Sequence, residues 1–218
     1  MVITEEHRRF LLDAARQTIQ RVLKGDPPGE IPQTTDPVLK MPAGCFVSLH
    51  DRRTHRLRGC VGRLQTPDPL IKTIHETAQS ALEDPRFRFD PVTLAELFHL
   101  ELEVSILSPL EPAANPLDFD PPNDGICLIC DGRSGTFLPQ VARETGWTRE
   151  QLLTRLCTEK MGLSANAWRN PAARLLKYKT VLIGPVPFVE RTEPAAVAPQ
   201  PAARVGSGFF GANQVFKL

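Results

Sequence analysis

The chain has 218 residues, 41% of them hydrophobic and 23% charged, which is ordinary for a globular protein with a sizeable core. Its 26 basic and 25 acidic residues leave a net charge of +1, so no overall field points to nucleic acid as a partner. No apolar run approaches the roughly 18 residues of a membrane span. Glu5 and Glu6 stand where a signal peptide would carry basic residues. We therefore expect a cytoplasmic protein that does not act on a membrane.

Four helical segments are predicted from apolar periodicity and end signals. The first spans residues 4–25, with Thr4 as N-cap and Gly25 after its end, and a proline-rich extended loop follows over residues 26–43. The others are predicted at residues 69–83 with Asp68 as N-cap, at 139–145 before Gly146, and from the capping box Thr148–Gln151 to Gly162.

Strands are predicted where apolar residues alternate with polar ones. Residues 44–50 and 55–61 should form a hairpin around residues 51–54, and residues 98–107 form the clearest strand, with Phe98 facing the core. Residues 126–130 and, more weakly, 174–183 are also expected to be strands. In the hairpin Cys45 would stand opposite Cys60, close enough for a disulfide or a redox pair. That pairing depends on the register of the two strands.

The stretch from Arg56 to Gly62 carries the strongest candidate site. On an extended strand Arg56, Arg58 and Cys60 share one face, and their positive field would favour a reactive thiolate. Gly59 and Gly62 would leave space beside the sulfur for a ligand. The alternative is a Cys60 that is only a small buried hydrophobic residue, which is the commoner use of a free cysteine on a strand.

Other cysteines and histidines are candidates for metal ligands or catalytic bases. Cys45, His50, His55 and Cys60 do not form a zinc site, because in a hairpin the histidines lie roughly 16 Å along the strands from the cysteines. Cys127 and Cys130 face opposite sides of a strand, which favours core packing. The sequence thus predicts no metal site, and it identifies no cofactor. His50, His55, His75 and His99 remain candidates for a base that would activate Cys60.

Acidic residues supply the rest of the candidate site. Asp84 and Arg86, two residues apart in a turn, are expected to pair with each other or with the chain beneath them. Glu101 and Glu103 occupy the polar face of the strand at 98–107. Glu103 could act as a general base or pair with Arg56 and Arg58 on a neighbouring strand.

Five motifs, together with Gly146-Trp147, resemble the AMMECR-type domain, known in prokaryotes as protein A of the AmmeMemoRadiSam system. They are Gly44-Cys45-Phe46-Val47-Ser48-Leu49, Leu57-Arg58-Gly59-Cys60-Val61-Gly62, Asp84-Pro85-Arg86-Phe87, Glu103-Val104-Ser105-Ile106-Leu107 and Leu138-Pro139-Gln140-Val141-Ala142. The resemblance implies an α+β fold, mostly antiparallel sheet with flanking helices, in two unequal subdomains around a cleft. It covers a domain at residues 1–190 and leaves a Pro/Ala-rich tail at residues 191–218, whose apolar end could fold back or engage a partner.

The resemblance also implies a genetic association with a Memo-type protein and a radical S-adenosylmethionine (SAM) enzyme. The family has no settled molecular activity, so a site location carries over but no catalytic residue. That location is Arg58, Gly59 and Cys60, with Asp84 and Arg86 as neighbours, to which we add Gly62 and Glu103. Cysteine at positions 45 and 130 departs from the family pattern, which puts a shared role for the Cys45–Cys60 pair in doubt.

Three functions follow from these observations. The first is an enzyme or enzyme component of a modification pathway, with Cys60 as nucleophile or substrate-anchoring thiol and Arg58 binding an anionic group or lowering the thiol pKa. The second is a non-catalytic module that presents the cleft to the Memo-type or radical SAM partner. The third, RNA binding or modification, is disfavoured by the near-zero net charge and the single tyrosine.

Overall fold

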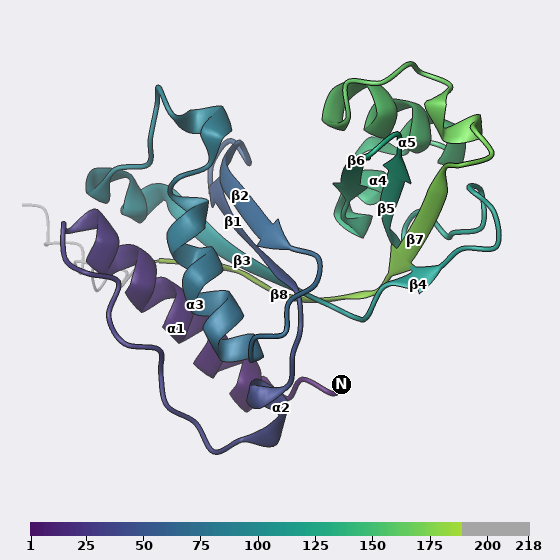
Figure 1. The fold of residues 1–218 in the computed structure, drawn as a ribbon. Coiled ribbons are helices and arrows are strands. Elements are labelled where there is room, and N and C mark those ends of the chain that lie inside the picture. Colours follow the sequence, from purple (N-terminus) through teal and green to yellow (C-terminus); the bar gives the residue numbers. More distant parts are fainter. Residues whose placement is uncertain (189–218) are drawn as a thin grey trace, which may run out of the picture.

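The protein folds into a larger and a smaller lobe, which lie side by side in Figure 1. The structure is a computed structural model that describes residues 1–188. Each lobe has a four-stranded antiparallel sheet and a hydrophobic core of its own. This arrangement confirms the expected α+β fold with mostly antiparallel sheet and flanking helices. The expected tail at residues 191–218 lies outside the described residues.

The larger lobe packs two helices against one face of a sheet with strand order β2-β1-β3-β8. Its elements are α1 (Glu5–Leu23), α2 (Pro37–Lys40), β1 (Cys45–Asp51), β2 (Leu57–Arg63), α3 (Leu70–Ala81), the 3-10 helices η1 (Pro85–Phe87) and η2 (Leu94–His99), β3 (Leu100–Leu107) and β8 (Thr180–Pro187).

The smaller lobe has a sheet with strand order β4-β7-β5-β6, covered by two short helices. Its elements are β4 (Glu111–Pro112), β5 (Gly125–Cys130), β6 (Arg133–Phe137), α4 (Pro139–Thr145), α5 (Arg149–Arg155), the π-helical turn η3 (Leu156–Lys160), the 3-10 helix η4 (Ala167–Arg169) and β7 (Arg174–Tyr178).

Local signals account for the ends of the helices. Thr4 caps α1 by accepting a hydrogen bond from the His7 backbone, and the His7 ring accepts one from Thr4 in return. Gly25 follows the helix with φ of 81°, the left-handed conformation expected there. Gly146 ends α4 in the same way. The expected N-cap Asp68 is wrong: Pro69 takes that position, and Asp68 instead bonds to Lys72 at 2.7 Å.

Two expectations about loops and strand ends need correction. The loop at residues 26–43 contains the single turn α2, capped by Asp36. Phe98 does not face the core: its residue is 64% exposed, because residues 94–99 form η2 and the strand begins only at Leu100. From there the predicted alternation holds, with Leu100, Leu102, Val104 and Ile106 buried on the helix side.

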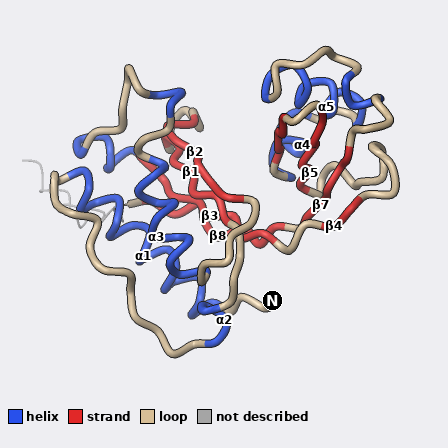
Figure 2. Tube along the Cα trace, viewed as in Figure 1, coloured by secondary structure: helices blue, strands red, loops and turns tan. Residues whose placement is uncertain are grey.

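The expected strand at residues 174–183 is in fact two strands that belong to different sheets. β7 pairs with β5 in the smaller lobe, and β8 pairs with β3 in the larger lobe. Lys179 lies between them and forms two hydrogen bonds with Ser108, which follows β3. Figure 2 shows the strands of both lobes converging at this junction. No helix within residues 1–188 is long and apolar enough to cross a membrane.

Candidate functional site

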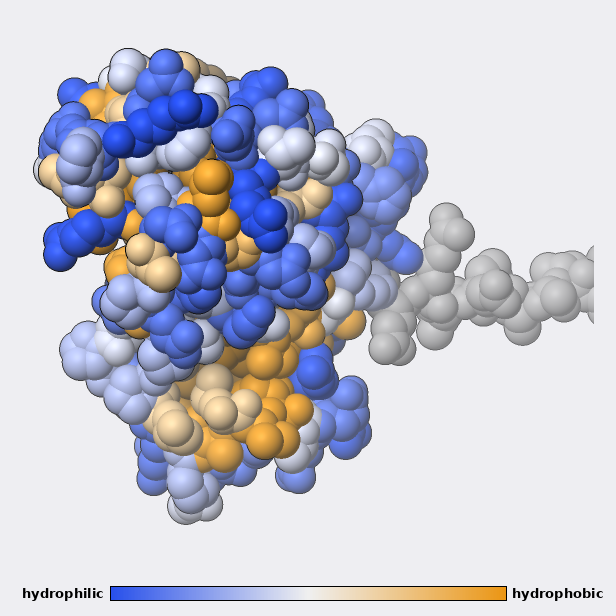
Figure 3. Space-filling view, turned by 90° about the vertical axis from the view of Figure 1, so that its right-hand side faces the viewer, coloured by the Kyte–Doolittle hydropathy of each residue, from blue (hydrophilic) through white to orange (hydrophobic). Residues whose placement is uncertain are grey.

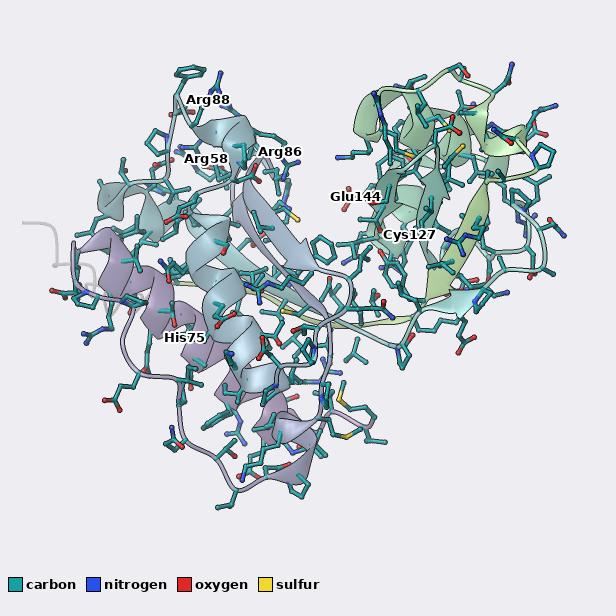
Figure 4. The ribbon with its side chains drawn as sticks, in the orientation of Figure 1. Arg58, His75, Arg86, Arg88, Cys127 and Glu144 are labelled. Atoms are coloured by element: carbon teal, nitrogen blue, oxygen red, sulfur yellow. The ribbon has the colours of Figure 1, made fainter. Side chains whose placement is uncertain are left out.

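A cleft of about 1060 Å³ lies between the two lobes. One wall is the face of the larger sheet that the helices leave free, together with the turn at Asp84–Arg86. The other wall is β6 and α4 of the smaller lobe. Figure 4 places Arg86 and Glu144 on opposite sides of the gap between the lobes. The polar residues that line the cleft are Ser48, His50, His55, Cys60, Asp84, Arg86, Glu101, Glu103, Ser134, Thr136, Gln140, Glu144 and Lys160.

The β1–β2 hairpin sets which side chains reach this cleft. Cys60 stands opposite Ser48, and Cys45 stands opposite Arg63, so the expected Cys45–Cys60 pair is wrong. The loop is longer than expected because Asp51 Oδ1 accepts hydrogen bonds from the backbone of Arg53 and Thr54, which delays the second strand. Cys45 faces the core with no exposed surface, on the opposite face from Cys60.

A β-bulge turns Arg58 away from the thiol. His50 is opposite Leu57 and Leu49 is opposite Gly59, which leaves Arg58 as the extra residue of the bulge. Its guanidinium bonds to Asp90 at 2.8 Å and Glu96 at 3.0 Å, outside the cleft lining. Arg56 lies 3.9 Å from the same Asp90 carboxylate. The prediction that Arg56, Arg58 and Cys60 share one face is therefore wrong, because period-two alternation breaks at a bulge.

Arg86 takes the place beside the thiol that we assigned to Arg58. Its Nη2 donates to the Cys60 carbonyl at 3.0 Å and to Asp84 Oδ2 at 2.6 Å. The same Asp84 oxygen accepts the Cys60 backbone N–H at 2.9 Å. The expected Asp84–Arg86 pair is thus present, and it holds both backbone polar groups of Cys60. Burial alone would raise the pKa of Asp84, but the hydrogen bonds from Arg86 and Cys60 outweigh it and keep that pKa below its usual value.

The wall formed by the larger sheet is called the cleft floor below. Three of its strands present a row of polar side chains there. Ser48 on β1 is the partner of both Cys60 on β2 and Glu103 on β3. Ser48 Oγ donates to Cys60 Sγ at 3.1 Å. One step along the strands, His50 on β1 is the partner of Glu101 on β3. Because antiparallel partners project to the same face, these groups meet although they are far apart in sequence.

The environment of Cys60 keeps its thiol protonated. Burial raises the pKa of the thiol; the Ser48 hydrogen bond and the Arg86 charge lower it, and the Asp84 and Glu103 charges raise it further. The net direction is upward, so the expected field-stabilised thiolate is not found. The thiol is half-buried at the cleft floor, and within residues 1–188 the other four cysteines are buried.

Alkylation should report this state directly. In the folded protein iodoacetamide is expected to modify Cys60 alone, more slowly at pH 7 than it modifies a free cysteine peptide. The rate should rise with pH through a midpoint above the free value of about 8.5, because the thiolate is the attacking form. Mass spectrometry of timed samples, with Cys60→Ser as control, gives the site and the rate. Fast reaction at pH 7 would contradict the raised pKa.

Glu103 is the second perturbed group of the floor. Burial is the largest cause that raises its pKa; the Gln140 hydrogen bond and the His50 charge lower it, and Glu144 and Glu101 raise it. The result is a carboxyl group that holds its proton at higher pH than an ordinary glutamate. Glu103 does not pair with Arg56 or Arg58, since Arg58 is engaged by Asp90 and Glu96.

Gln140 is a site residue that sequence reasoning missed. It lies in the first turn of α4 on the opposite wall, and its Nε2 donates to Glu103 Oε1 at 3.3 Å and to Ser105 Oγ at 2.9 Å. The only signal for it was its place in the motif Leu138–Ala142, which identified the domain without indicating a contact with Glu103. The contact joins residues 37 positions apart, and nothing in local periodicity reports it.

The two glycines of the motif serve packing. A side chain at Gly59 would overlap the carbonyl oxygen of Ala81 at the end of α3, and one at Gly62 would overlap the Phe46 ring. Their small size therefore lets the helix and the aromatic ring approach β2 closely. Gly62 is in the cleft lining, where the Phe46 ring occupies the space beside it, whereas Gly59 faces the end of α3 and offers no space for a ligand.

The remaining sequence candidates divide between the cleft and the interior. His50 and His55 line the cleft, but His75 is buried and hydrogen-bonded to Thr18 on α1. Cys127 and Cys130 are buried in the smaller lobe, as expected from their pattern. Within residues 1–188, no group of three or more histidine, cysteine, aspartate or glutamate residues is arranged to hold a metal ion.

A second hollow of about 440 Å³ lies at another edge of the larger sheet. It is lined mainly by apolar residues such as Met41, Leu64, Ile106 and Val181, and Lys179 is its only titratable side chain. Figure 3 shows apolar residues gathered in the lower half of one side of the molecule. Acid–base groups are thus concentrated in the interlobe cleft, which makes it the candidate active site.

Comparison with known proteins places this architecture in a family. The sequence profile of AMMECR1 matches residues 12–183, which include both lobes and every polar group of the cleft floor. The chain belongs to the AMMECR1 family. A protein of Thermococcus gammatolerans is 35% identical over 185 residues, covering 81% of this chain and 89% of that relative. Protein PH0010 of Pyrococcus horikoshii is also 35% identical over 185 residues, covering 81% of this chain and 88% of the relative.

The AMMECR1 fold is also seen in a solved structure. The crystal structure of uncharacterized protein PH0010 from Pyrococcus horikoshii superposes with a TM-score of 0.74 and 34% identity, over 83% of this chain and 92% of that one. The likeness extends over most of both chains, and the residues matched by the AMMECR1 profile come from both lobes. The floor residues Ser48, Cys60 and Glu103 and the cross-cleft Gln140 therefore belong to the AMMECR1 domain.

Proposed function

We propose that this protein is an enzyme or enzyme component of a modification pathway and that it acts at the interlobe cleft, with Glu103 as the group that transfers a proton. The observation that carries the proposal is the row Cys60–Ser48–Glu103 on the cleft floor, met by Gln140 from the other lobe. Residues from three strands and a separate helix converge where a ligand could be enclosed by both walls.

The acid–base role of Glu103 is supported by its surroundings. A general acid or base works best when its pKa lies near the working pH, and burial moves the pKa of Glu103 upward toward that range. A protonated Glu103 can donate its proton to a ligand atom at the cleft floor, and the resulting carboxylate can accept a proton in return. His50, one row away on β1, offers a second group for proton exchange with solvent.

Cys60 fits a different role from the one its motif first suggested. Its thiol is uncharged and accepts a hydrogen bond from Ser48, while Asp84 and Arg86 fix its backbone. Such a thiol contacts and positions a ligand at the cleft floor. It becomes a nucleophile only when a bound ligand or base removes its proton.

The pathway itself is proposed from the family resemblance. The association of AMMECR-type proteins with a Memo-type protein and a radical SAM enzyme supports a shared reaction sequence in which this chain handles one intermediate. Both proteins are therefore the proposed partners.

A substitution in the native host tests the acid–base role. We expect Glu103→Gln, which keeps the shape of the side chain but cannot lose a proton, to reproduce the metabolite and protein-modification changes caused by deleting the gene. General acid–base groups contribute roughly 10²- to 10⁴-fold to rate, so the loss should be nearly complete. Untargeted mass spectrometry of cell extracts measures it.

The control is Glu30→Gln, an exposed glutamate of the loop before α2, which should behave as wild type. Both variants should retain the wild-type melting temperature within a few degrees. A Glu103→Gln strain that matches wild type would refute the acid–base role.

The second candidate function is a non-catalytic interaction module. It is favoured by the exposed aromatic rings of Phe89 and Phe98, which are 87% and 64% exposed on the segment that follows the cleft turn at Asp84–Arg86. Calorimetry with the purified Memo-type protein and radical SAM enzyme of the same host separates the two functions. If Phe89→Ala abolishes binding and reproduces the deletion while Glu103→Gln matches wild type, the module is the function.

A further inference from the structure

The two lobes are joined in a way that permits relative movement. Each lobe has its own hydrophobic core, and within residues 1–188 the chain crosses between them only after β3 and after β7. The crossings lie side by side, where Ser108 and Lys179 exchange two hydrogen bonds of 2.9 Å. Two adjacent short connections between rigid bodies are the usual form of a hinge.

Close to this hinge, one side chain connects the walls of the cleft. Gln140 on the first turn of α4 donates to Glu103 and to Ser105, both on β3 of the larger lobe. Among residues 1–188 it is the only residue of the smaller lobe whose side chain forms a hydrogen bond across the cleft to the floor. The contact sits on the group to which we assigned proton transfer.

We propose that Gln140 is a positioning residue that acts as a latch: it holds the Glu103 carboxyl in the closed cleft, so that the site is complete only when the two lobes are closed. This inference rests on the proposed role of Glu103. Gln140 need not touch the reacting atoms; it acts by joining α4 to the cleft floor.

The free energies of the closed and open arrangements are expected to differ little. Gln140 Oε1 is buried without a hydrogen-bond partner, and an unsatisfied buried acceptor destabilises the arrangement that buries it. Glu103 is half-buried among groups that influence its charge: His50 on β1, Glu101 on its own strand and Glu144 on α4. The two bonds from Gln140 offset these costs. Closed and open arrangements should therefore be close in free energy.

The latch predicts a dependence on pH with a definite sign. Closing buries Glu103, and burial is the largest cause that raises its pKa. The closed arrangement therefore binds the Glu103 proton more tightly than the open one. By linkage, lowering the pH through the closed-state pKa favours closure, and raising it favours opening. A ligand that binds both walls would shift the same balance.

Replacing Gln140 with leucine separates the latch from a simple hydrogen bond. Leucine keeps the apolar volume but cannot donate, so Glu103 and Ser105 would be unpaired in a closed cleft. We expect the lobes of Gln140→Leu to open, the radius of gyration to increase, and the pKa of Glu103 to fall toward its ordinary value. Small-angle X-ray scattering and carbon-13 NMR titration of the full chain measure the two effects.

The opposite result would overturn the latch. If the lobes stay closed, losing the donor while keeping burial must raise the pKa of Glu103, since the Gln140 bond lowers it. Val141→Ala, the next residue of α4 and also in the cleft lining, should change neither quantity. Glu103→Gln serves as a second variant, because an amide can still accept from Gln140 and should keep the lobes closed at every pH.

These measurements are independent of the host experiment. Opening in Gln140→Leu together with a wild-type phenotype for Glu103→Gln would leave the latch intact and refute the proposed acid–base role. If the lobes of Gln140→Leu stay closed while Glu103→Gln reproduces the deletion, the latch is refuted and the acid–base role is supported.

Discussion

Replacing Asp84 with alanine is expected to lower the free energy of unfolding by about 3 kcal/mol. The carboxylate is almost fully buried, and it accepts hydrogen bonds from Cys60 N and from Arg86. Without it the partly buried Cys60 N–H has no protein partner, at a cost of about 1–3 kcal/mol, and η1 loses its cap, at about 1 kcal/mol. The Arg86 side chain is 48% exposed, so water screens the lost charge pair and its contribution is small.

The effect should depend on pH in one direction. The folded-state pKa of Asp84 is depressed, so its charge-dependent stabilisation is present above the unfolded pKa of about 3.9 and is lost as pH falls through the folded value. Asp84→Asn keeps the shape and one acceptor but no charge. The stability difference between wild type and Asp84→Asn should be constant above about pH 5 and should shrink below about pH 4.

Urea unfolding at several pH values measures this difference. Asp13→Ala, which removes a 58% exposed partner of Arg16, is the matched surface control and should change stability by less than about 1 kcal/mol. The Asp84 variants should also increase the alkylation rate of Cys60, because the hydrogen bonds through which Asp84 and Arg86 hold the Cys60 backbone are lost. An Asp84→Ala protein that is as stable as wild type and whose Cys60 is alkylated at the same rate would contradict the role of Asp84 in holding the Cys60 backbone.

Arg58→Ala is expected to lower the free energy of unfolding of the larger lobe by about 3 kcal/mol. The guanidinium is 7% exposed and bonds to Asp90, Glu96 and the Asp90 carbonyl, which ties the segment around η1 and η2 to β2. Breaking a buried ion pair costs about 3–5 kcal/mol, and the low end applies because Asp90 is 66% exposed. Arg58→Lys should recover little, since one ammonium cannot reach the same acceptors.

Arg56→Ala provides the matched control two residues away. Its side chain is 67% exposed and lies 3.9 Å from Asp90, so its removal should cost less than about 1 kcal/mol. Amide hydrogen exchange at residues 84–99 measures the loss of stability in the larger lobe. Tryptophan fluorescence reports unfolding of the smaller lobe instead, because Trp147 and Trp168 both lie there. If Arg58→Ala and Arg56→Ala lower the free energy of unfolding equally, the bulge does not make Arg58 more important for stability than Arg56.

Arg58 also shows how a motif can mislead about chemistry. Its position two residues before Cys60 indicates a charge that activates the thiol, but the bulge makes it a structural residue. The positive charge at the thiol comes from Arg86, 26 residues away along the chain. Because a bulge is set by the fit between strands and by the loop that joins them, alternation within one strand could not predict it.

Several features were determined by the sequence alone, because the interactions behind them are local. The caps of α1, α4 and α5 follow from Thr4, Gly146 and Thr148, since a cap involves residues three or four apart. The alternation from Leu100 to Ile106 identified β3 and its buried face. The Asp84–Arg86 pair was predictable for the same reason, as both groups lie in one turn.

Tertiary structure decided what lies next to what. The register that opposes Cys60 to Ser48, the division of residues 174–187 between two sheets, and the contact of Gln140 with Glu103 all join segments whose relative position has no local signal. The pKa directions of Cys60 and Glu103 depend on the same contacts, because burial is the largest cause of each. Local sequence thus determined the elements and the motifs, while only packing between distant segments decided which groups share the cleft and in which charge state.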